Sequence, residues 1–370
     1  MSRSQFRAFG AQRKTLGKLV FGAACLSLLS ACGEEEVILA GKREPLRAEA
    51  SEALAAVGEN RSQAVSFAKT QNNSSWTQRH GSPATRISHP AFGGAMQLQW
   101  SANIGAGDSR HGRITADPVV AGGKIFTLDS EARVSATAAS GGAVWSVSLV
   151  PERDAGRDAT GGGLAYANGV LFVSSGFGLM TALDADSGKE LWQQKLDASG
   201  SGNPTVRDGV VYLVAGDATA WALDADSGRI LWQLSSTADK NNIMGGPAPA
   251  VNDQLVVFSF GSGEMQAAFR KGGLRLWDAI ISGQRRGLAR SRISDITGDP
   301  VIVGTTLYAG THSGRTVALD AGTGSRIWTA EEGTTHFGST YLFRNREYLE
   351  AYKAMHVKRL ESIGITVTAD

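Results

Sequence analysis

The sequence predicts an all-β fold, a β-propeller assembled from four-stranded blades. A motif of the form Ala-Leu-Asp-Ala-x-x-Gly-x-x-x-Trp returns along the chain, and tryptophans recur every 40 to 51 residues. Short segments rich in β-branched and aromatic residues, separated by Gly and Asp turns, lie between the copies. Repeats of this length built from short strands are typical of propellers. Because one blade cannot bury both of its faces, neighbouring blades are expected to stack on one another.

Each copy of the motif predicts a strand, a tight turn and a second strand. Two copies, 182–192 and 222–232, are nearly identical, a third occupies 318–328, and two degenerate copies end at Trp145 and Trp277. In all five the glycine stands four residues before the tryptophan, which gives the pairs Gly141 and Trp145, Gly188 and Trp192, Gly228 and Trp232, Gly273 and Trp277, and Gly324 and Trp328. Asp and Ser favour turns, and Gly adopts the positive φ that a tight hairpin requires. We therefore expect the tryptophans at one register of the second strand, packed between blades.

A second kind of segment opens each unit and reads strand, Gly or Asp turn, strand. These segments are 118–126, 165–173, 204–213, 249–257 and 300–308. Four of them begin with proline, which is tolerated at a strand start because it need donate no hydrogen bond to the ladder there. Upstream, residues 96–101 alternate in the same way and contain Trp100, so they are expected to form the tryptophan-bearing strand of a further blade.

The N-terminal segment, residues 1–31, is predicted to be a lipoprotein signal peptide. Five basic residues and no acidic residue accompany an apolar run over 19–29, which is too short to span a bilayer as a stable helix. The run leads into Leu-Ser-Ala-Cys-Gly, which resembles the bacterial lipobox and implies cleavage before Cys32 and lipidation of its thiol. Residues 32–75 are rich in Glu, Ala, Arg, Ser and Asn and are expected to form a flexible tether.

Charge excludes one class of partner. The formal net charge is +2, but it becomes −3 once the five basic residues of the signal peptide are removed. A basic surface that would attract nucleic acid is therefore not predicted.

The propeller is assigned to residues 76–333 and an atypical tail to residues 334–370. In the tail, apolar residues recur at three- and four-residue spacing with charged residues between them, a pattern typical of an amphipathic helix. The residues concerned are Leu349, Tyr352, Met355, His356, Leu360 and Ile363. A short C-terminal helix is therefore expected, which is not blade material.

The repeat resembles that of the pyrroloquinoline-quinone (PQQ) type propellers. Together with the lipobox, the acidic tether and the one-domain layout, it makes the chain similar to the BamB family of outer-membrane assembly lipoproteins over roughly residues 15–333. The family has eight blades, whereas about five to six are recognisable here, so a truncated or rearranged C-terminus is expected. Gly33 after the cysteine is similar to the signal that sorts lipoproteins to the outer membrane. The resemblance therefore implies a lipid anchor on the periplasmic side of the cell outer membrane.

The resemblance also implies a non-enzymatic scaffold of the β-barrel assembly machinery (the BAM complex). The implied partners are the periplasmic (POTRA) domains of the central barrel subunit BamA, other BAM subunits and unfolded outer-membrane proteins. The family binds BamA through two neighbouring loops, which correspond to 241–247 and 292–297 here. The implied partner-binding residues are Ile243, Met244, Arg292, Ile293 and Asp295. Met244 stands where the family has an arginine, and Thr297 stands where it has a second acid.

Two alternatives stay open: a PQQ-dependent dehydrogenase-like periplasmic propeller, and a binding module of another envelope complex. The dehydrogenases hold Ca²⁺ through carboxylate and amide oxygens, and many stack a disulfide between adjacent cysteines on the quinone. This chain has no adjacent cysteines. Its repeated aspartates, Asp184, Asp224 and Asp320, favour a structural role, since a catalytic acid occurs once rather than once per blade. The six histidines lack metal-ligand spacing, so we expect no catalytic residue, cofactor or metal site.

Overall fold

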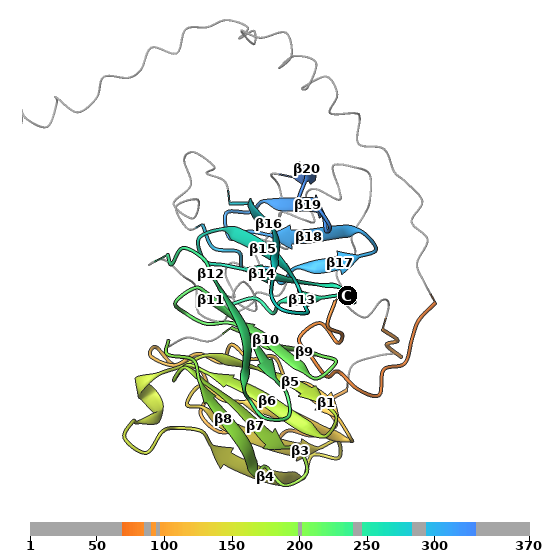
Figure 1. Cartoon of the computed structure of the whole chain (residues 1–370). Coiled ribbons are helices and arrows are strands. Elements are labelled where there is room, and N and C mark those ends of the chain that lie inside the picture. Colours follow the sequence, from red (N-terminus) through yellow and green to blue (C-terminus); the bar gives the residue numbers. More distant parts are fainter. Residues whose placement is uncertain are drawn as a thin grey trace, which may run out of the picture. The chain divides into compact units, whose positions relative to one another are not determined.

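The computed structural model describes residues 69–84, 90–93, 97–198, 202–239, 246–282 and 294–330. These residues contain five four-stranded antiparallel sheets, and each sheet takes its strands in sequence order (Figure 1). We call them blades 1 to 5. The predicted signal peptide, Cys32, the tether up to residue 68 and the C-terminal helix lie outside the described residues.

The strands of the five blades have the following bounds. Blades 1 and 2 comprise β1 (Val119–Ala121), β2 (Lys124–Leu128), β3 (Arg133–Ala138), β4 (Ala143–Ser148), and then β5 (Gly162–Ala167), β6 (Val170–Ser175), β7 (Leu179–Asp184), β8 (Glu190–Lys195). Blades 3, 4 and 5 comprise β9 (Thr205–Arg207), β10 (Val210–Val214), β11 (Thr219–Asp224), β12 (Ile230–Ser235); β13 (Ala250–Val251), β14 (Leu255–Ser259), β15 (Glu264–Phe269), β16 (Arg275–Ile280); and β17 (Val301–Val303), β18 (Thr306–Gly310), β19 (Thr316–Asp320), β20 (Arg326–Ala330). A short 3-10 helix, η1 (Gly156–Asp158), lies between blades 1 and 2. The predicted all-β propeller fold and its five repeat units are confirmed.

The hydrophobic core lies between blades rather than within any one of them. Four clusters of buried apolar side chains each combine two consecutive blades, from blades 1 and 2 through to blades 4 and 5. The first strands of consecutive blades contact one another, so they form the inner edge of the array. The fourth strands form the outer edge, and most of their side chains are exposed or half-buried. Stacking of neighbours therefore supplies the burial that a single blade lacks.

In blades 1 to 4 the tryptophan of the fourth strand packs against the next blade. The Trp192 ring of blade 2 lies against Gly228 in the β11–β12 turn of blade 3, and its indole N–H donates to the Ala225 carbonyl at 2.9 Å. Gly228 has φ +72°, the conformation that the motif predicts. The same contacts recur between Trp145 and Gly188, Trp232 and Gly273, and Trp277 and Gly324.

The repeated aspartates close these turns. Asp224 accepts hydrogen bonds from the backbone N–H and the hydroxyl of Ser227, at 2.8 and 2.6 Å. The hydroxyl hydrogen bond is the main reason that the pKa of Asp224 lies below its usual value. Asp184 and Asp320 make the equivalent contacts in blades 2 and 5. These carboxylates therefore have a structural role, since they accept hydrogen bonds from residues of the turns.

The strand expected over residues 96–101 is wrong for the part that the structure describes. Residues 97–101 have no strand assignment. Trp100 nevertheless repeats the contacts of the blade tryptophans, since its ring lies against Gly141 and its indole N–H donates to the Ala139 carbonyl at 2.9 Å. The docking geometry depends on the ring and the receiving turn, and it does not require a hydrogen-bonded strand behind it.

Alanine substitutions at Gly228 and Gly209 separate backbone strain from the blade contact. Both glycines lie in blade 3 with similar φ, +72° and +75°. A Cβ at Gly228 would lie 2.6 Å from the Trp192 ring, whereas a Cβ at Gly209 would meet no atom within 4 Å. We expect Gly209→Ala to cost about 1–2 kcal/mol of unfolding free energy, and Gly228→Ala about 1–3 kcal/mol more. If urea unfolding gave the same loss of unfolding free energy for both variants, the tryptophan contact would not constrain the turn.

Candidate partner-binding site

Residues 76–84, which we call the inner strap, run along the inner edge and hydrogen-bond to the first strand of every blade. The bonded pairs are Trp76 with Val120 (β1), Thr77 with Tyr166 (β5), Gln78 with Val206 (β9), Pro83 with Val251 (β13) and Ala84 with Ile302 (β17), all between 2.7 and 3.0 Å. The five strand residues are equivalent, because each pairs with the residue five positions later on its second strand. The strap therefore ties the described blades together at one level.

Gln78 makes its contact through the side chain rather than the backbone. Its amide nitrogen donates to the Val206 carbonyl at 2.7 Å, and its amide oxygen accepts from the Val206 N–H at 3.0 Å. The side chain thus substitutes for a paired strand at a buried edge. Gln78 itself is buried.

Replacing Gln78 by alanine is expected to lower the free energy of unfolding by about 1–3 kcal/mol, because both backbone groups of Val206 lose their partner. Gln254→Ala is the matched control, since that glutamine is exposed. Urea unfolding of both variants checks the prediction. Equal, small losses would mean that water replaces the Gln78 amide at this edge.

A buried ionic cluster joins the strap to the connections between blades. Asp299 precedes β17, and its carboxylate lies 2.8 Å from Arg79 Nε and 3.0 Å from His80 Nε2. The other oxygen of Asp299 accepts a 2.9 Å hydrogen bond from the backbone N–H of Ala248, which precedes β13. Arg79 also lies 3.3 Å from Asp117, which precedes β1. The cluster therefore connects the strap with the approaches to blades 1, 4 and 5.

The environment of Asp299 favours its charged form. Burial acts to raise the pKa of Asp299, but the charge of Arg79 and the hydrogen bonds from His80 and Ala248 outweigh it, so the pKa lies below its usual value. A lowered folded-state pKa contributes stability above the unfolded pKa of about 3.9 and loses it as pH falls further. We expect the free energy of unfolding of Asp299→Asn to fall less steeply than that of the wild type below about pH 4. The free energies of unfolding of both proteins are measured by urea unfolding at pH 5 and pH 3. An equal decrease between these pH values in the wild type and in Asp299→Asn would contradict this assignment.

The described residues that flank the two predicted partner loops lie at the same end of the blades, because the fourth strand of each antiparallel sheet ends where its first strand begins. Ile243, Met244, Arg292 and Ile293 lie outside the described residues. Asp295 is described and only 5% exposed, and its carbonyl accepts from the His312 N–H at 3.0 Å. The contact between Ala248 and Asp299 brings the C-terminal ends of the two loops together. The sequence interpretation missed Gln78, Arg79, His80 and Asp299, because nothing periodic marks them.

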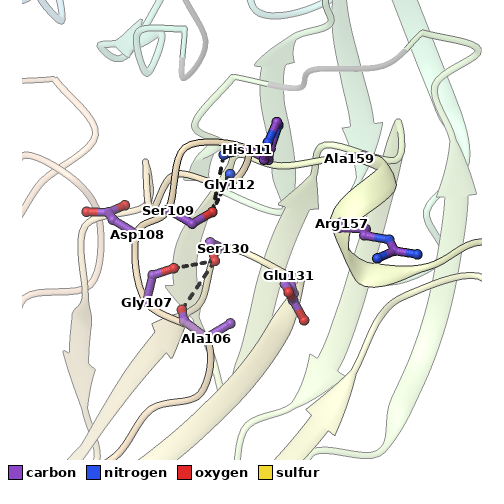
Figure 2. Close-up of a pocket in the computed structure, with 10 residues that line it drawn as sticks. All are labelled: Ala106, Gly107, Asp108, Ser109, His111, Gly112, Ser130, Glu131, Arg157 and Ala159. Atoms are coloured by element: carbon purple, nitrogen blue, oxygen red, sulfur yellow. Dashed lines mark hydrogen bonds between the residues drawn. The ribbon is translucent and has the colours of Figure 1, made fainter.

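A polar pocket of about 350 Å³ lies at the same end of blades 1 and 2 (Figure 2). It is lined by Ala106, Gly107, Asp108, Ser109, His111, Gly112, Ser130, Glu131, Arg157 and Ala159. The Ser109 hydroxyl accepts from the backbone N–H of Gly112 at 2.9 Å, and the Ser130 hydroxyl donates to the Gly107 carbonyl at 2.8 Å (Figure 2). Both serines therefore hold the shape of the loop before β1.

The described residues also bear on metal binding and on membrane insertion. They contain no group of three or more His, Cys, Asp or Glu side chains placed to hold a metal ion. They also contain no helix that is long and apolar enough to cross a membrane.

Comparison with known proteins identifies the repeat. The family described as outer membrane protein assembly factor BamB matches residues 130–340, more than half of the chain. The protein of that name from Escherichia coli (strain K12) is 33% identical over 242 residues, 64% of this chain and 61% of the relative. The one from Xanthomonas campestris pv. campestris is 35% identical over 241 residues, 63% of this chain and 58% of the relative. The chain therefore spans about three fifths of the length of these relatives.

Solved structures share the fold at lower identity. BamB from Moraxella catarrhalis is 20% identical with a TM-score of 0.51, covering 60% of this chain and 66% of that one. A europium-containing methanol dehydrogenase is 17% identical with a TM-score of 0.52, covering 69% of this chain and 58% of that one. These likenesses show the fold alone, whereas the family match spans four repeat units and part of blade 1. The chain belongs to the family of the outer membrane protein assembly factor BamB.

Proposed function

We propose that this chain is a non-enzymatic scaffold lipoprotein of the outer-membrane β-barrel assembly machinery. In this proposal it binds the periplasmic POTRA domains of BamA, meets other BAM subunits, contacts unfolded outer-membrane proteins, and assists their folding and insertion. Membership of the BamB family carries the proposal. The two relatives described above, both named outer membrane protein assembly factor BamB, support the general role.

The arrangement of the loops supports the proposed contact surface. The described residues that flank the two loops lie at the same end of adjacent blades, and Asp299, which follows the second loop, accepts a hydrogen bond from Ala248, which follows the first. A partner that bridges blades 3 to 5 at this end would meet both loops. Within them, Ile243, Met244, Arg292 and Ile293 are the proposed contact residues. Asp295 is buried, so we propose that it acts through the shape of its loop.

We also propose the domain boundaries that the sequence predicts. Residues 1–31 are the proposed signal peptide, Cys32 the lipid attachment site, 32–75 the tether, 76–333 the propeller and 334–370 the tail. The inner strap begins at residue 76, the first residue assigned to the propeller.

A non-enzymatic role is also supported by how the fold uses its polar groups. The repeated aspartates are engaged by turn residues, as Asp184 and Asp224 are by Ser187 and Ser227. The inner edges of all five blades hydrogen-bond to the chain's own strap. A ligand on those edges would have to displace the strap. No cofactor enters the proposal.

Binding of purified BamA periplasmic domains to the immobilised full-length protein tests the proposal. We expect the wild type to bind, and we expect the double variant Ile243→Asp, Arg292→Glu to lose at least about tenfold in affinity, as interface hot spots do. Lys189→Glu is the control, because Lys189 is exposed in the β7–β8 turn at the opposite end of blade 2. Absence of binding by folded wild-type protein would refute the BamA contact. Equal binding by all three proteins would refute the choice of loops.

A further inference from the structure

We infer that Arg79, His80 and Asp299 are positioning residues: they fix residues 247–249 and 298–300, through which the two partner loops enter blades 4 and 5, and binding of the partner depends on this fixation, an inference that rests on the proposed function. The Asp299 side chain is 1% exposed, and those of Arg79 and His80 are also buried. A partner docked on the surface therefore does not reach the carboxylate. Any effect of Asp299 on binding must be transmitted through the loops it connects.

The sequence around Asp299 restricts how the two loops can be held. Ala248 stands between Pro247 and Pro249, and because proline has no backbone N–H, Ala248 provides the single donor of this tripeptide. That donor is bonded to Asp299 at 2.9 Å. Asp299 itself precedes Pro300, which restricts its backbone to extended conformations. One carboxylate thus fixes the end of the loop before β13 and the end of the loop before β17.

The strap provides the fixed reference for this carboxylate. Arg79 and His80 bind the Asp299 oxygen that does not face Ala248. They lie between Gln78, which is paired with Val206 of blade 3, and Pro83, which is bonded to Val251 of blade 4. A charge pair anchored to two blades is a more rigid support than a loop side chain alone. Buried polar networks are the usual means of fixing one arrangement among several.

A positioning residue and a contact residue are expected to affect different rate constants of binding. If the cluster only selects the competent loop arrangement, weakening it lowers the population that can bind, and the apparent affinity falls by that fraction. Once bound, the partner holds the loops, so the dissociation rate is unchanged. Loss of a direct contact instead acts mainly on the dissociation rate.

The test immobilises the full-length protein and measures association and dissociation of the BamA periplasmic domains, so that any unfolded fraction lowers the signal but not the rates. We expect Asp299→Asn and the milder His80→Gln to reduce the association rate about five- to tenfold, with the dissociation rate within about twofold of the wild type. The contact variant Arg292→Glu is expected to raise the dissociation rate. Amide hydrogen exchange at Ala248 should accelerate in both cluster variants, because its acceptor is weakened or displaced.

Each outcome decides a separate claim. Unchanged exchange at Ala248 in Asp299→Asn would overturn the inference, as would a loss of affinity that lies wholly in the dissociation rate. Faster exchange with unchanged association would also overturn it, because the loops would then move without consequence for binding. If folded wild type does not bind BamA domains, the proposed function fails, and the exchange result alone decides whether Asp299 fixes the loops. His80→Gln keeps both claims testable if Asp299→Asn does not fold.

Discussion

Replacing Arg79 by methionine is expected to lower the free energy of unfolding by about 3–5 kcal/mol, because the Asp299 carboxylate would stay buried without its nearest cation. The loss arises from the unpaired charge rather than from the arginine contacts alone. The double variant Arg79→Met, Asp299→Leu should therefore recover much of it, since an apolar pair can replace a buried ion pair with little cost. Chemical unfolding of the single and double variants at pH 7 measures both effects.

Arg275→Met is the control for Arg79→Met. Arg275 lies 3.8 Å from Asp278 on the outer strand β16, and both side chains are exposed. Exposed pairs contribute about 0–1 kcal/mol. If Arg79→Met cost no more than this control, the cluster would not hold the strap.

Replacing Trp192 by alanine is expected to cost about 3–5 kcal/mol, the range for deleting a large aromatic side chain from a packed site. The ring contacts Gly228 of the next blade, lies 5.9 Å from the Phe172 ring of its own blade, and donates to the Ala225 carbonyl. Alanine would therefore open a cavity between blades 2 and 3 and leave a carbonyl without its donor.

Trp328→Ala is the matched control, because Trp328 occupies the same motif position and is 43% exposed. It also lies 6.0 Å from a ring of its own blade, that of Tyr308. We expect its loss to be at most about half that of Trp192→Ala, in proportion to the apolar area that is buried. Equal losses in urea unfolding would mean that contacts within the blade, rather than the contact between blades, account for the tryptophan's contribution.

The blades were predictable because their determinants are local and repeated. Asp224, Ser227 and Gly228 specify one turn within five residues, and Trp232 follows at a fixed distance. These local signals all indicate the same turn and strand, and such agreement is what allows a fold to be predicted from a single sequence. The error at residues 97–101 came from the same rule, since the pattern at Trp100 marks a docked ring and not a paired strand.

The strap and its cluster could not be predicted because their partners lie far along the chain. Gln78 pairs with a residue 128 positions away, and the strap contacts each blade through a single residue, which leaves no periodicity. Gln78, Arg79 and His80 form a polar run that sequence rules assign to a solvated loop. The loop positions came from a resemblance to the family, and the link that Asp299 makes between them required coordinates.

Co-purification from detergent-solubilised outer membranes tests whether this chain is a subunit of the β-barrel assembly machinery. The full-length protein would be captured through a C-terminal tag, beside the Ile243→Asp, Arg292→Glu variant and the Lys189→Glu control. We expect BamA to co-purify with the wild type and with Lys189→Glu, and its recovery to fall with the loop variant. Recovery of a different envelope complex by folded wild-type protein, with no BamA, would contradict it.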